Sequence, residues 1–174
     1  PTRGQTLGLR ALDRRLLTGP GWLPPALLWH EVAEHGLAVA GLRPDQLTIA
    51  RDPDGVVDWC RHTLANQWGP WWDRTARSLS LAGFGGLGPL APTTGVLGVA
   101  RIRYTLETGG IISKCGGGEW ALEAMAPRWR RILTEALRVR NHPDRPSLYR
   151  SPWRRRRDAL AFVDSVLTDA ERWA

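Results

Sequence analysis

The sequence predicts a mainly helical protein: a compact bundle of about six helices over residues 45–174, preceded by a helix and a short strand that form the incomplete end of an α/β domain. Two observations carry this prediction. Apolar residues recur at helical spacing over most of the second part, and glycine or proline separates the periodic stretches. The 174 residues are 43% hydrophobic and 24% charged, so the chain can bury a core rather than stay disordered.

Composition limits the function classes. The formal net charge is +7, and a basic protein attracts nucleic acids, nucleoside triphosphates and anionic membranes. Cys60 and Cys115 form no CxxC pattern, which excludes a zinc ribbon and favours a reducing cytosol. No apolar run approaches the ~18 residues of a membrane span, and no signal peptide is recognisable. We therefore expect a cytoplasmic protein, and the start at Pro1 without a methionine suggests a piece of a longer one.

Residues 1–44 are expected to be a linker and the tail of a preceding domain. Residues 1–25 are rich in glycine and proline and contain one short candidate helix, Leu9–Leu17. A helix is predicted over Ala26–His35, because two prolines open it and a glycine follows it. The apolar run 37–40 then predicts a short strand.

Two histidines on the Ala26–His35 helix invite a zinc-protease hypothesis, which their spacing rejects. A metalloprotease helix places its two histidines four residues apart on one face. His30 and His35 are five apart, and Glu34 stands where the second ligand would be. Five residues turn a helix by roughly 500°, which leaves the rings about 140° apart. We therefore predict no metal site here.

The helical part begins after a turn at Arg43–Asp45, where we place the domain boundary. Asp52-Pro53 is a typical helix start, with an acid at the cap and proline in the first turn. Gly69-Pro70 is expected to break this helix and start the next. For the tryptophans here we favour helix–helix packing over a wall for a planar ligand; they are Trp59, Trp68, Trp71 and Trp72.

The glycine-rich segment Leu81–Pro92 superficially resembles a phosphate loop. It lacks a GK[ST] ending and a preceding strand, so we expect a flexible connection between helices. Thr93 or Thr94 can cap the helix that follows. That helix is apolar around much of its circumference, which indicates burial among other helices. Arg101 lies on it, where a charge needs a partner.

The most informative stretch is Val96–Trp120, VLGVARIRYTLETGGIISKCGGGEW. Gly109-Gly110 should end the first helix with a left-handed residue, and Ser113 could cap the next. Lys114, the only lysine in the chain, follows directly. Glycines 116–118 cost roughly 1 kcal/mol each in a helix relative to alanine. They therefore indicate either a loose turn or a close backbone approach.

Two further helices complete the predicted bundle, starting at Pro127 and at Ser151-Pro152. The last one opens with the run Arg154–Arg157. Cations at a helix N-terminus oppose its dipole, so some of these arginines should pair with acids elsewhere. No recognition helix for a nucleic-acid groove is evident. We favour a solvated basic face over nucleic-acid binding.

The Val96–Trp120 stretch resembles the C-terminal helical domain of the aminoglycoside (streptomycin/spectinomycin) adenylyltransferase family, within the nucleotidyltransferase superfamily. The shared pattern is a helix ending A-R-x-x-Y-T, a T-G turn, an I-x-x-K and a W-A-L helix. The matching residues are Ala100, Arg101, Tyr104, Thr105, Thr108, Gly109, Ile111 or Ile112, Lys114, Trp120, Ala121 and Leu122. A looser resemblance, by helix order, covers residues 45–174. It implies that residues 1–44 are the remnant of an N-terminal nucleotidyltransferase domain.

The resemblance implies adenylyl transfer, in which an acceptor hydroxyl attacks the α-phosphate of ATP and pyrophosphate leaves. It also implies ATP contacts for Arg101 and Lys114, which we predict as the nucleotide-binding residues. A lone lysine beside glycine amides suits a phosphate contact, although it could be an ordinary solvated side chain. The family's Gly-Ser and paired Asp signature, which holds Mg²⁺, is absent from this chain. Catalytic residues are therefore expected in a preceding domain, and ATP and Mg²⁺ only in an intact protein.

Departures from the family pattern bear on the substrate. A nucleotide-contacting tyrosine of the family falls near Arg140, and Cys115 replaces an acid beside the lysine. Segment Leu87–Thr94 contains none of the acids that hold the drug. The acceptor could be an aminoglycoside or another hydroxylated compound. The alternative hypotheses are a non-catalytic helical interaction module or degenerate relic, and thirdly a nucleic-acid binder using Arg154–Arg157.

Overall fold

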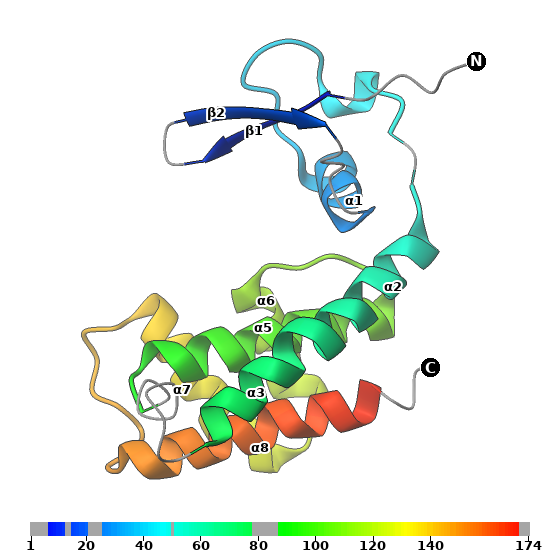
Figure 1. Ribbon diagram of the computed structural model, residues 1–174. Helices are drawn as coiled ribbons and strands as arrows, with labels where there is room; N and C mark the ends of the chain where they lie inside the picture. Colours follow the sequence, from blue (N-terminus) through cyan, green and yellow to red (C-terminus); the bar gives the residue numbers. More distant parts are fainter. Residues whose placement is uncertain (1–6, 13–14, 21–25, 50, 78–86, 171–174) are drawn as a thin grey trace. The chain divides into compact units, whose positions relative to one another are not determined.

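The computed structural model describes two compact units of the chain. They are Pro1–Val56 and Val57–Ala174, whereas the sequence placed the domain boundary between residues 44 and 45. Within them the structure describes residues 7–12, 15–20, 26–49, 51–77 and 87–170 (Figure 1).

The first unit contains a β-hairpin where the sequence predicted linker and a short helix. Strands β1 (Leu7–Leu12) and β2 (Arg15–Pro20) are antiparallel, with Leu7 opposite Pro20. The Leu9–Leu17 helix is therefore wrong. Positions 7, 9 and 11 are apolar and alternate with glycine and arginine, which is the period of a strand rather than of a helix.

Helix α1 (Ala26–His35) forms as predicted, but the short strand after it does not. Residues 37–40 have no strand structure, and Leu37 and Val39 are 91% and 100% exposed. A strand needs a neighbour to satisfy its backbone groups, and among the described residues the only sheet is the hairpin. The predicted end of an α/β domain is thus not confirmed. A 3₁₀ turn, η1 (Pro44–Gln46), follows.

The predicted helical bundle is confirmed by six α-helices within the described part of residues 51–170. They are α2 (Pro53–Thr63), α3 (Gly69–Ala76), α5 (Leu90–Thr108), α6 (Lys114–Ala124), α7 (Arg130–Asn141) and α8 (Pro152–Ala170). Helix α5 is central and packs against α6, α7 and α8 (Figure 1). Its residues Val96, Leu97, Val99 and Ala100 are fully buried. A helix apolar on most sides is stable only when surrounded in this way.

The start of α5 differs from the prediction. The helix already begins at Leu90, so neither Thr93 nor Thr94 is its cap. The Thr93 hydroxyl instead donates to the carbonyl of Pro89 at 3.0 Å, one turn back in the same helix. Most of the glycine-rich segment Leu81–Pro92 lies outside the described residues, so its predicted flexibility stays a prediction.

Helices α2 and α3 join through a π-helical turn, η2 (Leu64–Trp68), where the sequence predicted a break. Pro70 has no backbone N–H to donate to a residue four positions earlier. The turn before it is wider: the N–H of Gly69 donates to the carbonyl of Leu64, five residues back. The predicted start of the next helix at Gly69-Pro70 is confirmed, because α3 begins at Gly69, but the predicted break is replaced by a wider turn in which the chain stays helical.

The tryptophans of this segment pack against the core, as favoured from the sequence. Trp68 is 9% exposed and meets Trp71 edge to face, with ring centroids 5.8 Å apart. Two glycines of α5 make room for them. A Cβ on Gly95 would lie 2.5 Å from the Trp71 ring, and one on Gly98 would lie 2.4 Å from the Trp68 ring. Their large apolar area therefore stabilises the bundle.

The run Arg154–Arg157 at the start of α8 is not a uniformly solvated face. Arg155 and Arg156 are each 7% exposed. Arg156 donates to two backbone carbonyls at the C-terminal end of α3, which have no partner within their own helix. Arg155 contacts the carboxylate of Glu135 at 3.4 Å, which confirms that an acid elsewhere pairs with this run. The prediction of a solvated face is wrong for these two arginines.

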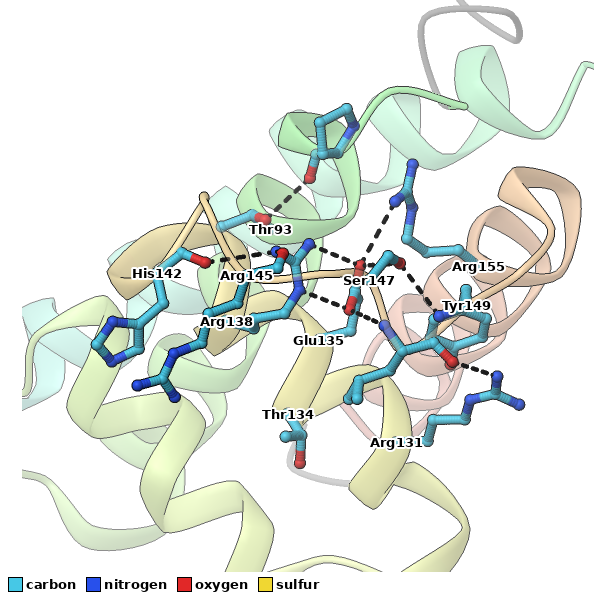
Figure 2. A network of polar contacts seen from close by, with 12 residues as sticks. Thr93, Arg131, Thr134, Glu135, Arg138, His142, Arg145, Ser147, Tyr149 and Arg155 are labelled. Atoms are coloured by element: carbon cyan, nitrogen blue, oxygen red, sulfur yellow. Dashed lines mark hydrogen bonds and ion pairs between the residues drawn. The ribbon is translucent and has the colours of Figure 1, made fainter.

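Glu135 on α7 anchors the segment that follows this helix. It is 0% exposed and accepts two hydrogen bonds from Arg138, both at 3.0 Å. It also accepts from the Ser147 hydroxyl at 2.6 Å and from the backbone N–H of Leu148 at 2.9 Å (Figure 2). Burial alone would raise the pKa of Glu135, but these donors outweigh it and lower the pKa to about 2. The carboxylate is thus a fixed anion that holds the segment after α7 in place.

Candidate functional site

The junction of α5 and α6 forms as the sequence predicts. Gly109 ends α5 in the left-handed conformation, at φ 72°, and its N–H donates to the Thr105 carbonyl at 2.8 Å. Ser113 caps α6, because its hydroxyl oxygen accepts from the N–H of Gly116 at 3.1 Å. These two local signals place Lys114 as the first residue of α6.

The glycines after Lys114 bring α6 into direct contact with α5. A Cβ on Gly117 would lie 2.7 Å from the Cα of Arg101, and one on Gly118 would lie 2.6 Å from the Leu97 side chain. Both glycines are buried. The close-approach alternative is therefore the correct one, and the turn is not loose. This contact fixes the N-terminus of α6 beside Arg101.

Three cationic side chains from three successive helices interact electrostatically here. They are Arg101 on α5, Lys114 on α6 and Arg140 on α7, and we call them the cationic cluster. Burial lowers the pKa of Lys114, and the positive charges of Arg101 and Arg140 lower it further. Within the described ranges no member of the cluster forms an ion pair with a carboxylate. The cluster therefore carries uncompensated positive charge.

Arg140 is oriented by residues of the same junction. Its Nε donates to the Sγ of Cys115 at 3.2 Å, and the Cys115 thiol donates to the Oδ1 of Asn141 at 3.2 Å. The sequence predicted Arg101 and Lys114 as a site; Arg140 was noted only because a nucleotide-contacting tyrosine of the family falls near it, and it was not itself included. Only the packing of α7 against α6 brings it there, and no local pattern signals that packing.

The α1 histidines and the remaining helices give less support for a function than the cationic cluster does. His30 is buried, and its Nε2 lies 3.2 Å from a carboxylate oxygen of Glu34. Among the described residues, no group of three or more His, Cys, Asp or Glu side chains is placed to hold a metal ion. In the same part of the chain, none of the helices combines the length and the apolar character that crossing a membrane requires.

The chain from Pro89 to Asp169 carries the central helix, the cationic cluster and the Glu135 network. Residues 89–169 match the family model of the aminoglycoside adenylyltransferase C-terminal domain. The match spans α5, α6, α7 and nearly all of α8, and it confirms the resemblance found in the sequence. No curated protein matches the chain.

Within the segment that matches this family model, the cluster has the properties of an anion site. Two guanidinium groups can each offer paired N–H donors, and the ammonium group adds a compact charge. The cluster lies at the N-terminus of α6, where the helix dipole also favours an anion. Chemically, such a group can hold and neutralise phosphates, and none of its three members is a carboxylate that could act as a general base.

Proposed function

We propose that the adenylyltransferase-like helical domain binds ATP and holds its phosphates with the cationic cluster of Arg101, Lys114 and Arg140. The observation that carries the proposal is the uncompensated charge of these three residues, inside the segment that matches the family. Burial lowers the pKa of Lys114 and two neighbouring cations lower it further, so a bound polyphosphate relieves repulsion that the free protein contains.

In this proposal the domain contributes binding and charge neutralisation to adenylyl transfer. An acceptor hydroxyl attacks the α-phosphate, the bond to the β-phosphate breaks, and pyrophosphate leaves. Cationic groups that contact the departing phosphates stabilise the charge that develops there. The carboxylates that would hold Mg²⁺ belong to a nucleotidyltransferase domain, whose signature this sequence does not contain. We assign no metal ligand or catalytic base to this chain.

The proposed acceptor is a small hydroxylated compound, and aminoglycosides are the first to test because of the family match. Nucleic acid is a weaker candidate partner. Two of the four arginines in the Arg154–Arg157 run are buried in contacts within the bundle, so the run offers phosphates little free charge.

Calorimetric titration of ATP·Mg²⁺ into the full-length protein tests the proposal. Lys114→Ala and Arg140→Ala should each weaken binding roughly tenfold to a hundredfold, since a hydrogen bond to a charged group contributes about 1.5–3 kcal/mol. Arg157→Ala is the matched control, because it removes one positive charge at a side chain that is 76% exposed and outside the cluster. Equal affinities for the parent protein and both cluster variants would remove the cluster from ATP binding.

A further inference from the structure

A cavity of about 380 Å³ opens between the second half of α7 and the segment after it. Its walls are mostly apolar and include Leu137, Pro146 and Leu148, and Thr134 and Asn141 add polar atoms. Small-molecule sites have volumes of roughly 300–1,000 Å³ and this kind of lining, apolar with a few polar groups. The cavity therefore has the size and chemistry of a ligand site.

The cavity adjoins the cationic cluster. Asn141 lines the cavity and also accepts from the thiol of Cys115, which in turn accepts from Arg140. On the same side, Leu137 lies 3.0 Å from the position that a Cβ on Gly118 of α6 would take. One short chain of contacts thus leads from the cavity to the N-terminus of α6, where Lys114 begins the helix.

The wall contributed by the segment after α7 is held in place before any ligand binds. Glu135 accepts from Ser147 and from the N–H of Leu148, and Arg138 donates to the carbonyls of His142 and Arg145 (Figure 2). These bonds fix both ends of the segment against α7. A pre-formed site avoids the entropy cost of ordering a loop on binding.

The charged residues that line the cavity favour some classes of ligand over others. Within the described part of the chain Arg138, His142 and Arg145 line the cavity and no carboxylate does; Arg138 is paired with Glu135, so Arg145 supplies the uncompensated positive charge of the lining. A polycationic aminoglycoside would meet like charge here, whereas a flat, uncharged ring attached to an anion would not. Guanidinium planes and apolar walls are also what nucleobases stack against. The lining therefore favours the base of a nucleotide over a cationic acceptor.

We propose that this cavity binds the base of the nucleotide whose phosphates are held by Arg101, Lys114 and Arg140. The inference rests on the proposed function and extends it to a second subsite. In this arrangement α6 and α7 bind the nucleotide at both ends, the phosphates at the cluster and the base in the cavity.

Titrations with ATP and with inorganic tripolyphosphate separate the two subsites. The full-length protein should bind ATP roughly tenfold more tightly than tripolyphosphate, because stacking of one base contributes about 1–3 kcal/mol. Thr134 is exposed on α7 and lines the cavity, so Thr134→Trp fills it. This variant should bind the two ligands equally, with tripolyphosphate affinity unchanged. Thr94→Trp is the matched control, because Thr94 is also an exposed helical threonine but lies outside the cavity lining.

The outcomes distinguish the two proposals. If tripolyphosphate binds and the parent protein prefers ATP by less than about twofold, well below the energy of one stacked base, the cavity assignment is overturned and the cluster stands. The same holds if Thr134→Trp keeps the parent's preference for ATP. If tripolyphosphate does not bind at all, the proposed function itself fails. The comparison in the parent protein needs no variant, so a Thr134→Trp protein that fails to fold leaves the test intact.

Discussion

Glu135→Gln removes one buried charge and keeps the shape of the side chain. The pKa of Glu135 is about 2 in the folded protein, against an ordinary value of 4.5. Since one pKa unit corresponds to about 1.4 kcal/mol, the ionised carboxylate contributes about 3 kcal/mol at neutral pH. The amide would also turn hydrogens toward donors that include Arg138 and Ser147, leaving buried groups unpaired. We expect the free energy of unfolding to fall by about 3 kcal/mol at pH 7.

The pH dependence of this loss has a definite sign. The folded pKa of Glu135 lies below the unfolded one, so between the two values the unfolded state binds more protons. The stabilisation is complete above about pH 4.5 and disappears as the pH falls toward about 2. The difference between parent and Glu135→Gln should therefore be constant from pH 7 to about 5 and then shrink progressively.

Urea unfolding followed by tryptophan fluorescence and circular dichroism measures the difference at each pH. Glu123→Gln is the matched control, because Glu123 is exposed on α6, and it should change stability by less than about 0.5 kcal/mol. A parent-minus-variant difference that stays the same from pH 7 to pH 2.5 would refute the reasoning. It would mean that Glu135 is not held ionised by its donors.

Two further substitutions test the contacts of the bundle by the same unfolding measurement. Arg156→Ala leaves two carbonyls at the end of α3 without their donor and should cost about 1–3 kcal/mol. Arg157→Ala should cost under about 0.5 kcal/mol, and equal losses would contradict the assignment of a buried clamp. Gly117→Ala forces a methyl group against the backbone of Arg101 and should cost about 1–3 kcal/mol. Gly69→Ala has a carbonyl at 3.7 Å as its nearest non-neighbouring contact; the gain in helix propensity is offset by the preference of a residue before proline for extended backbone, so it should change stability by less than about 1 kcal/mol, and a loss there as large as that of Gly117→Ala would count against the close-contact argument.

The junction around Lys114 was predictable because its determinants are local. A left-handed glycine and a serine cap act within a few residues of their own positions, and both are found where the sequence places them. The helical spacing of apolar residues likewise predicted the bundle. Arg101 and Lys114 were predicted as nucleotide contacts because of the resemblance to the family, and that role stays a prediction.

The remaining features depend on contacts between distant residues. Glu135 resembles any acid on an amphipathic helix until Ser147 and Arg155 surround it. Arg140 joins the cationic cluster only because α7 packs beside α6. In the first unit, the apolar run 37–40 lacked the pairing partner that a strand needs, and the sequence alone could not show this.

The π-helical turn η2 has a consequence at the level of the gene. It holds one residue more than an α-helical turn, and one residue in an α-helix corresponds to about 100° of rotation. Deletion of a single codon between residues 64 and 68 would remove the extra residue of this turn and rotate Trp71 away from the recess at Gly95, while Pro70 would then lie inside a turn too narrow for it. The number of residues between positions 64 and 68, rather than their hydrophobicity, therefore determines which side of α3 faces α5. A change in the number of residues before α3 would therefore need a matching change in the recess at Gly95 that receives Trp71.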